Sequence, residues 1–283
     1  MNKVIFESNK IKKDISIAIL SDIHYYEGYN EKILNKLYKQ IKNNKPDFIC
    51  IPGDIVDQTR ININNCKPLF KWLENIANIS PTIITLGNHD IKEGKRHSWK
   101  EFRNIEYEKK LNSIKNVFLL NDEIIEFYNI SFYGNNLSFK YYEKDDENYE
   151  TFKQEIKNIN PKFNKENYNI FLFHSPINIY KYLKENKKHP LNQCDLILSG
   201  HMHNGCIPNW ICKLLNNTFK TSRSIISPLR TLFPKYSYGK IYNEQVNGFV
   251  YEGINKLSKC TKILHKLDFI NTKNIQIITI KKY

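Results

Sequence analysis

The sequence predicts an α/β fold in which buried sheets are flanked by helices. Short runs of β-branched and other apolar residues recur along the chain, each of a length typical of a buried strand. Amphipathic stretches, with apolar residues at helical spacing around 33–41 and 70–77, lie between several of these runs. Strands that alternate with helices are typical of sheets covered by helices. The expected strands are 15–20, 48–51, 82–86, 117–120, 130–133, 170–173, 195–198 and 275–280.

Length and composition favour one folded domain. The 283 residues are 41% hydrophobic and 13% aromatic, which is enough for a sizeable core. No internal repeat and no Gly/Ser-rich linker marks a boundary, so we expect a single domain over residues 1–283. Between about 207 and 238 the alternation breaks, and apolar residues mix with lysines and arginines. This segment is predicted to be a cap or insertion before the last strands.

The chain is strongly basic, with 43 Lys and Arg against 29 Asp and Glu, a net charge of +14. Such a charge attracts nucleic acid or an anionic membrane. Abundant Lys, Asn and Ile with few Arg are equally typical of an AT-rich genome. Six scattered cysteines without a C-x-x-C pair indicate neither a disulfide framework nor a zinc ribbon. No apolar run approaches the ~20 residues that span a bilayer, so we expect a cytoplasmic protein, with peripheral membrane contact left open.

Polar motifs follow five of the expected strands. They are SDIH at 21–24, GDIVD at 53–57, GNHD at 87–90, a single histidine at 174, and GHMH at 200–203. Ligands of open α/β sheets bind at the carboxyl ends of the strands. Five loops of this kind are therefore expected to converge on one site.

The residue types in these loops suit metal ions. Asp, His and an Asn carbonyl are hard or borderline ligands for Mn, Fe, Zn or Mg, and no thiolate is among them. Such a set can hold two ions about 3.5–4 Å apart if one carboxylate is shared, and Asp54 after the glycine turn at Gly53 is the expected bridge. The candidate ligands are Asp22, His24, Asp54, Asn88, His174, His201 and His203.

The order of motifs D-x-H, G-D-x-x-D, G-N-H-D, a lone His and G-H-x-H resembles the calcineurin-like metallophosphoesterase superfamily. The resemblance runs from Asp22 to His203. It implies a four-layer fold, a two-sheet β-sandwich flanked by helices, here with a cap segment after G-H-x-H. Any one of these short motifs occurs often by chance, whereas five in order are specific.

The resemblance also implies separate roles for these residues. It places Asp22, His24 and His203 on one metal ion, and Asn88, His174 and His201 on the other, with Asp54 between them. His89 would be the catalytic histidine, and Asp57 would hold its ring. Asp90 is an alternative partner for the ring.

The expected reaction is hydrolysis of a phosphate ester. A water or hydroxide that bridges two divalent ions becomes a nucleophile near neutral pH. His89 would protonate the leaving oxygen or stabilise the charge on it, and a carboxylate behind the ring would fix its tautomer.

The substrate is left open between several classes. Protein Ser/Thr phosphatases similar to this chain carry Arg directly after G-D-x-x-D, where Gln58 stands here. The segment after His203 is similar to a bacterial phosphodiesterase-like branch with lipid-directed members, although Asn204, Gly205 and Cys206 replace its common Gly-Gly-Gln. A phosphodiesterase or phosphatase is therefore expected, with a lipid-linked substrate as one option. The alternatives are a nuclease or nucleotide phosphodiesterase and, less favoured because no ligand is missing, an inactive binding scaffold.

Three basic residues are candidates for contact with the substrate. Lys95 and Arg96 belong to a basic run from Lys92 to Arg103 after G-N-H-D, and Arg230 lies in the predicted cap. Such a run is also typical of a solvated helix face. The cap itself could lie on a membrane surface, cover an acyl chain or pack on the core. The sequence leaves the oligomeric state open.

Overall fold

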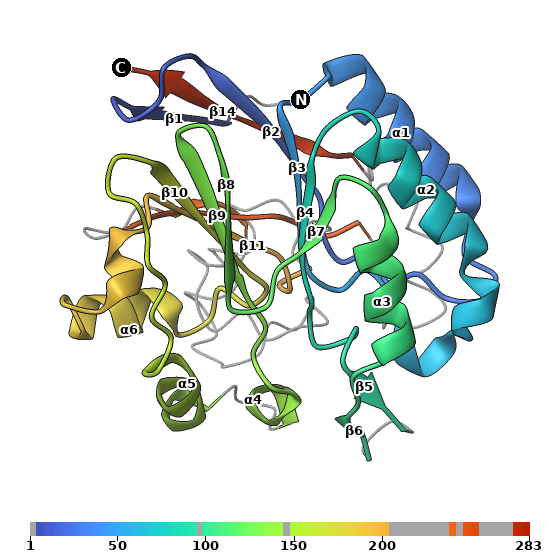
Figure 1. Ribbon diagram of the computed structural model, residues 1–283. Helices are drawn as coiled ribbons and strands as arrows, with labels where there is room; N and C mark the ends of the chain where they lie inside the picture. Colours follow the sequence, from blue (N-terminus) through green and yellow to red (C-terminus); the bar gives the residue numbers. More distant parts are fainter. Residues whose placement is uncertain (1–3, 95–97, 144–147, 204–237, 242–245, 255–273) are drawn as a thin grey trace, which may run out of the picture.

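Two six-stranded sheets face each other, and helices cover the outer side of each (Figure 1). The computed structural model describes residues 4–94, 98–143, 148–203, 238–241, 246–254 and 274–283. The layers therefore run helix, sheet, sheet, helix, and the predicted two-sheet fold is confirmed. The predicted cap at 207–238 lies outside the described residues except for Tyr238.

The first sheet has the strand order β1-β14-β2-β3-β4-β7. Its pairs are parallel except for β14 with β2. The four parallel strands from β2 to β7 come in chain order, so their carboxyl ends meet at one edge. The strands are β1 (Val4–Ser8), β2 (Ile15–Ile19), β3 (Phe48–Pro52), β4 (Thr82–Thr85), β7 (Val117–Leu119) and β14 (Gln276–Lys282).

The second sheet has the strand order β12-β13-β11-β10-β9-β8. Its central strands are parallel, and the two edge strands β12 and β8 are antiparallel to their neighbours. The strands are β8 (Glu123–Phe127), β9 (Ile130–Asn135), β10 (Tyr168–Phe173), β11 (Leu196–Ser199), β12 (Gly239–Ile241) and β13 (Asn247–Val250).

Helices α1, α2 and α3 lie outside the first sheet, α5 and α6 lie on the side of the second, and α4 lies next to α5 at the bottom of the view (Figure 1). Helix α1 begins after Asn30, whose side chain accepts a hydrogen bond from the Lys32 amide, and it buries Leu34, Leu37 and Ile41 at helical spacing. The helices are α1 (Glu31–Asn44), α2 (Lys67–Ala77), α3 (Ile105–Ser113), α4 (Phe139–Glu143), α5 (Tyr149–Ile156) and α6 (Ile179–Glu185). Short 3₁₀ turns lie at Gln58–Arg60, Ile63–Asn65 and Pro190–Gln193.

Strand β10 shows how the layers are packed. Ile170 and Leu172 belong to the core shared with the first sheet, whereas Phe171 and Phe173 belong to a second core with α5 and α6. Successive side chains of a strand point to opposite faces. The strand is therefore buried on both sides, which explains why its sequence is a continuous apolar run.

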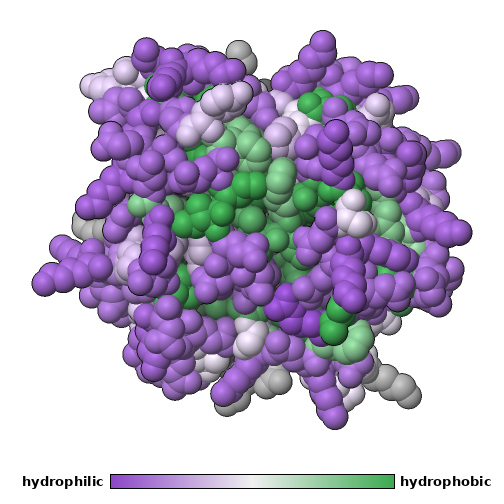
Figure 2. Space-filling view, viewed as in Figure 1, coloured by the Kyte–Doolittle hydropathy of each residue, from purple (hydrophilic) through white to green (hydrophobic). Residues whose placement is uncertain are grey.

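Apolar side chains also gather in the middle of one face of the molecule, surrounded by polar ones (Figure 2). At the edges of the two sheets, Phe118 of β7 and Phe127 of β8, two partly buried residues packed against the core, have ring centroids 5.5 Å apart. Among the described residues, no helix is long and apolar enough to cross a membrane.

The basic run after the G-N-H-D motif does not form a helix where the structure describes it. Lys92–Glu93 (β5) and Lys100–Glu101 (β6) pair as a short antiparallel hairpin. The candidate substrate residues Lys95 and Arg96 lie outside the described residues, as does Arg230.

Candidate metal centre

The carboxyl ends of β2, β3 and β4 in one sheet and of β10 and β11 in the other meet at a single site. The first sheet supplies the loops with Asp22, His24, Asp54 and Asn88, and the second supplies the histidines at 174, 201 and 203. Of these side chains, all except Asn88 are buried. In the structure the five loops lie together at one site, as predicted.

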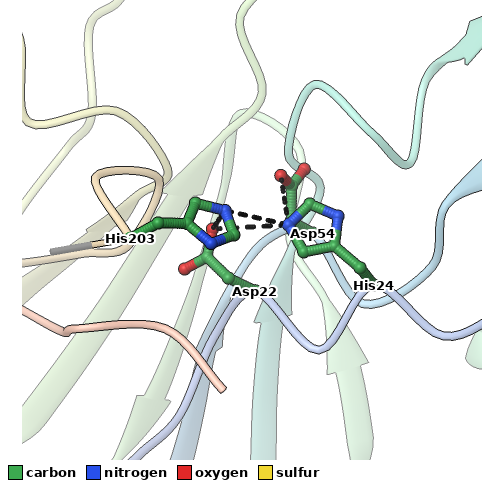
Figure 3. A group of neighbouring side chains, drawn as sticks. All are labelled: Asp22, His24, Asp54 and His203. Atoms are coloured by element: carbon green, nitrogen blue, oxygen red, sulfur yellow. Dashed lines mark hydrogen bonds and ion pairs between the residues drawn. The ribbon is translucent and has the colours of Figure 1, made fainter. Parts of the chain in front are cut away.

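Asp22, His24, Asp54 and His203 form the first group of ligand atoms. One ligand atom from each residue lies within 4.8 Å of the others. The side chains point toward one another (Figure 3), with 2.9 Å between His24 Nε2 and His203 Nε2 and 3.2 Å between His203 Nε2 and Asp22 Oδ1. Two ligands 2.0–2.1 Å from one ion stand about 3.3 Å apart in tetrahedral geometry. The spacing of this group therefore suits a divalent ion.

Asp54, His174 and His201 form the second group. His201 Nδ1 and Asn88 Oδ1 lie 3.1 and 3.2 Å from His174 Nε2. His174 Nδ1 lies 2.8 Å from the Pro52 carbonyl oxygen, to which it donates, so Nε2 faces the other ligands. The Asn88 carbonyl oxygen thus adds a fourth donor to this group.

Asp54 belongs to both groups. Its Oδ2 lies 3.5 Å from His24 Nε2 on one side and 3.4 Å from His174 Nε2 on the other. Its Oδ1 accepts a hydrogen bond of 2.7 Å from the His89 amide, which fixes the carboxylate. Burial would raise the pKa of Asp54, but His174, His89 and His24 more than offset this, so its pKa lies well below the usual value. Asp54 is therefore an anion placed between the two groups.

The backbone of this site is strained. Five of the predicted ligands have positive φ angles, a region that non-glycine residues seldom occupy and that costs on the order of 1–3 kcal/mol each. Such strain is retained where the surrounding structure requires a particular side-chain direction. The angles are 57° at Asp22, 46° at His24, 54° at Asp54, 71° at His201 and 46° at His203.

Gly53 explains why a glycine precedes Asp54. Its φ is 87°, and a Cβ at this position would lie 2.5 Å from His174 Nδ1. Any side chain would therefore displace the His174 ring.

His89 and Asp57 lie beside these groups. His89 Nδ1 is 3.4 Å from Asp57 Oδ1, and the His89 ring contacts the His24 ring edge-on at 4.4 Å between centroids. The alternative partner Asp90 instead accepts hydrogen bonds from the amides of Val56 and Gly87. It ties the 87–90 loop to the 53–57 loop.

Sequence reasoning did not single out two further side chains at the site. Lys92 is fully buried, and its Nζ lies 3.0 Å from His89 Nε2. The Tyr142 ring lies 5.5 Å from the His201 ring between centroids. A lysine within a basic run and a tyrosine among 18 tyrosines carry no pattern that would have identified them.

The chain belongs to the calcineurin-like phosphoesterase family, whose family model matches residues 15–205. The matched part begins at β2 and includes every motif loop, so the resemblance seen in the sequence is confirmed. This membership places the chain among the metallophosphoesterases.

Two curated relatives are uncharacterized metallophosphoesterases. The one from Campylobacter jejuni is 28% identical over 71% of this chain and 47% of its own length, so this chain spans about half of that relative. The one from Aquifex aeolicus is 24% identical over 80% of this chain and 77% of its own length. A third relative, one of the subunits of the nuclease SbcCD from Staphylococcus saprophyticus, is 24% identical over 60% of this chain and 50% of its own.

Solved structures of related shape share little sequence with this chain. A phosphopantetheinyl hydrolase from Mycobacterium tuberculosis is 10% identical with a TM-score of 0.46, covering 89% of this chain and 94% of that one. A dimetal phosphatase from Danio rerio is 12% identical with a TM-score of 0.43, covering 86% and 88%. These likenesses are too weak to assign a substrate.

Metal binding at this site is expected to weaken as the pH falls. Burial would lower the pKa of His174, but the charge of Asp54 and the hydrogen bonds to Asp54 and Pro52 raise it to about 9. Because the pKa is raised, the ring keeps its proton below that pH, and a metal ion must displace it. Titration of the metal-free protein with Mn²⁺ at several pH values should give an affinity that rises from about pH 7 to about pH 8.5. An affinity for Mn²⁺ that does not change between these pH values would contradict the raised pKa of His174.

Proposed function

We propose that this protein hydrolyses a phosphate ester with two divalent metal ions. The observation that supports it most is the position of Asp54, whose Oδ2 lies within 3.5 Å of one histidine from each group of ligand atoms. A carboxylate shared in this way is what a two-ion site requires. The family to which the chain belongs is one of phosphoesterases.

The proposed ligands divide as the sequence motifs suggest. Asp22, His24 and His203 would hold one ion, Asn88, His174 and His201 the other, and Asp54 both. The donors fit because they are buried imidazole nitrogens and oxygens without a thiolate, a set that suits Mn, Fe, Zn or Mg. When bound, the two ions would supply Lewis acidity for the phosphoryl oxygens and lower the pKa of a water molecule.

His89 is the proposed catalytic histidine. It follows Asn88 in the chain and packs against His24, so its ring lies next to the proposed ligands without being part of either group. Asp57 Oδ1 lies 3.4 Å from Nδ1 of the ring, where its negative charge would favour a protonated Nδ1 and hold the ring in orientation. Asp57 is in turn fixed by the Thr59 hydroxyl, which donates to Oδ1 at 2.9 Å.

A nuclease is the second candidate. One relative is part of a nuclease, and the chain's net charge of +14 favours a polyanionic substrate. The lipid-linked substrate and the membrane contact depend on the 207–238 segment and stay predictions from the sequence.

A substrate panel tests the proposal. The Mn²⁺-loaded protein should hydrolyse at least one of a phosphomonoester, a phosphodiester, a short DNA and a glycerophospholipid, and a chelator should abolish the activity. Preference for the DNA would establish the nuclease alternative. A metal-loaded protein without activity on the whole panel would contradict the proposed reaction and favour a binding scaffold.

A further inference from the structure

The loop after β9 reaches the metal site without contributing a candidate ligand. Strand β9 pairs in parallel with β10, and their last residues, Asn135 and Phe173, lie opposite each other, so both strands end at the same edge of the sheet. The loop leads into α4, which carries Tyr142. The centroid of the Tyr142 ring lies 5.5 Å from that of His201 and 6.3 Å from that of His174. An aromatic ring therefore stands beside the second group of ligand atoms.

Helix α4 is fixed to its surroundings at two points, which restricts where Tyr142 can lie. The Phe139 amide donates a hydrogen bond of 3.1 Å to Glu101 Oε2 of the β5–β6 hairpin. On the other side, Tyr141 is buried, and its hydroxyl donates to the Ile177 carbonyl oxygen at 3.3 Å. A side chain that is held in place before binding loses little conformational entropy when a ligand packs on it.

Tyr142 is partly exposed, unlike its neighbour Tyr141. Its ring packs against both hydrophobic cores. Successive residues of a helix point about 100° apart, and the burial of Tyr141 leaves Tyr142 directed at the metal site. The two imidazole rings next to it are inclined at 55° and 60° to its plane, so neither lies flat against its face. A phosphoryl group on the ions would bring the rest of the ester close to this ring.

We propose that Tyr142 is a specificity-determining residue that stacks on a flat aromatic ring in the alcohol part of the ester. The substrate class is a nucleoside phosphate, because the sugar between phosphate and base lets the base turn to lie flat on a neighbouring ring. Stacking of bases on aromatic side chains contributes substantially to nucleic-acid binding and tolerates any base. This inference rests on the proposed function, which places the phosphoryl group on the two ions.

The first test measures binding and needs no turnover. The probes are the methylene phosphonate analogues of adenosine 5′-monophosphate and of ribose 5-phosphate, whose carbon–phosphorus bond is not hydrolysed. Isothermal titration calorimetry of the Mn²⁺-loaded protein should show that the adenosine analogue binds about tenfold more tightly or better. Equal affinities of the wild-type protein for the two probes, or no binding of either, would overturn the proposal.

Variants show whether Tyr142 is the source of this preference. Tyr142→Leu should reduce the preference for the adenosine analogue to less than about threefold while it keeps the metal content of wild type, and Tyr142→Phe should keep the preference. Tyr128→Leu is the matched control, because Tyr128 is fully exposed at the β8–β9 turn, at the end of β9 remote from α4, and it should change neither affinity. A Tyr142→Leu variant with an unchanged preference would overturn the proposal. Equal loss of affinity for both probes, or loss of the metal ions, would indicate a merely structural role and overturn it as well.

The second test separates KM from kcat. For whichever of adenosine monophosphate and its methyl diester the wild type cleaves, Tyr142→Leu should raise KM about tenfold and leave kcat within about threefold, because stacking holds substrate and transition state alike. For the corresponding ribose phosphate, KM should change by less than about threefold. A lower kcat with an unchanged KM would contradict stacking.

Failure of this proposal and failure of the proposed function are distinguishable. A wild-type protein that cleaved other esters of the substrate panel but neither adenosine ester would overturn the role of Tyr142 alone. If the wild type cleaved no ester at all, the proposed function would fail, and the calorimetric preference would still decide whether Tyr142 binds an aromatic group.

Discussion

Asp54→Ala is expected to remove both metal ions and to lower phosphoesterase activity by about 10³-fold or more. Asp54 Oδ2 faces His24 and His174, one from each group of ligand atoms, so its loss leaves neither group with its shared anion. The remaining buried imidazoles would also repel bound cations when protonated. Elemental analysis of the purified variant beside kinetic measurement checks both expectations.

Asp195→Asn is the matched control for Asp54→Ala. Asp195 precedes β11 at the strand end remote from the motif loops, and its carboxylate pairs with Lys10 at 2.8 Å. This variant should be less stable because an ion pair with partly exposed partners is lost, but it should keep two ions per chain. If Asp54→Ala kept its metals, or Asp195→Asn lost them, the assignment of Asp54 would be wrong.

His89→Asn is expected to lower kcat by about 10²- to 10⁴-fold while the metal content stays at that of wild type. His89 lies outside both groups of ligand atoms, and the hydrogen bond that it gives to Asp54 comes from the backbone amide, which the variant retains. The change therefore removes the ring that faces Asp57 without removing a ligand. Elemental analysis and steady-state kinetics on the same preparation separate the two effects.

His189→Asn provides the comparison for His89→Asn. His189 is a partly buried histidine outside the motif loops, where its Nε2 lies 3.2 Å from the Ile156 carbonyl oxygen. Its substitution should leave kcat unchanged. A His89→Asn variant that lost its metal ions as completely as Asp54→Ala would show that His89 is a ligand.

Much of the fold could be predicted because its central strands are buried on both faces. The runs at 48–51 and 170–173 are continuously apolar and became β3 and β10. The motif loops follow these strands directly, so the site could be predicted with them. The edge strand β8 was missed because its residues are half-buried or exposed and carry glutamates at 123 and 126, which leaves no apolar run to detect.

The local geometry of the site could not be predicted in the same way. Asp and His occupy left-handed backbone angles more readily than most residues, but no pattern marks which ones do. Lys92 shows the limit more clearly. In the sequence it starts a basic run typical of a solvated surface, whereas the hairpin buries it against His89 and Trp99. Its burial depends on packing against these two side chains, which no local pattern in the sequence indicates. That the chain forms a single domain, and that residues 207–238 form a cap, both remain predictions from the sequence.

The central claim is that two metal ions share Asp54, and electron paramagnetic resonance of the Mn²⁺-loaded protein tests it most directly. Two Mn²⁺ ions joined by one carboxylate, about 3.5–4 Å apart, are magnetically coupled. Protein with two equivalents of Mn²⁺ should therefore give the spectrum of a coupled pair, and Asp54→Ala should not. A spectrum of isolated Mn²⁺ from the wild-type protein, with only one equivalent retained, would contradict the two-ion site.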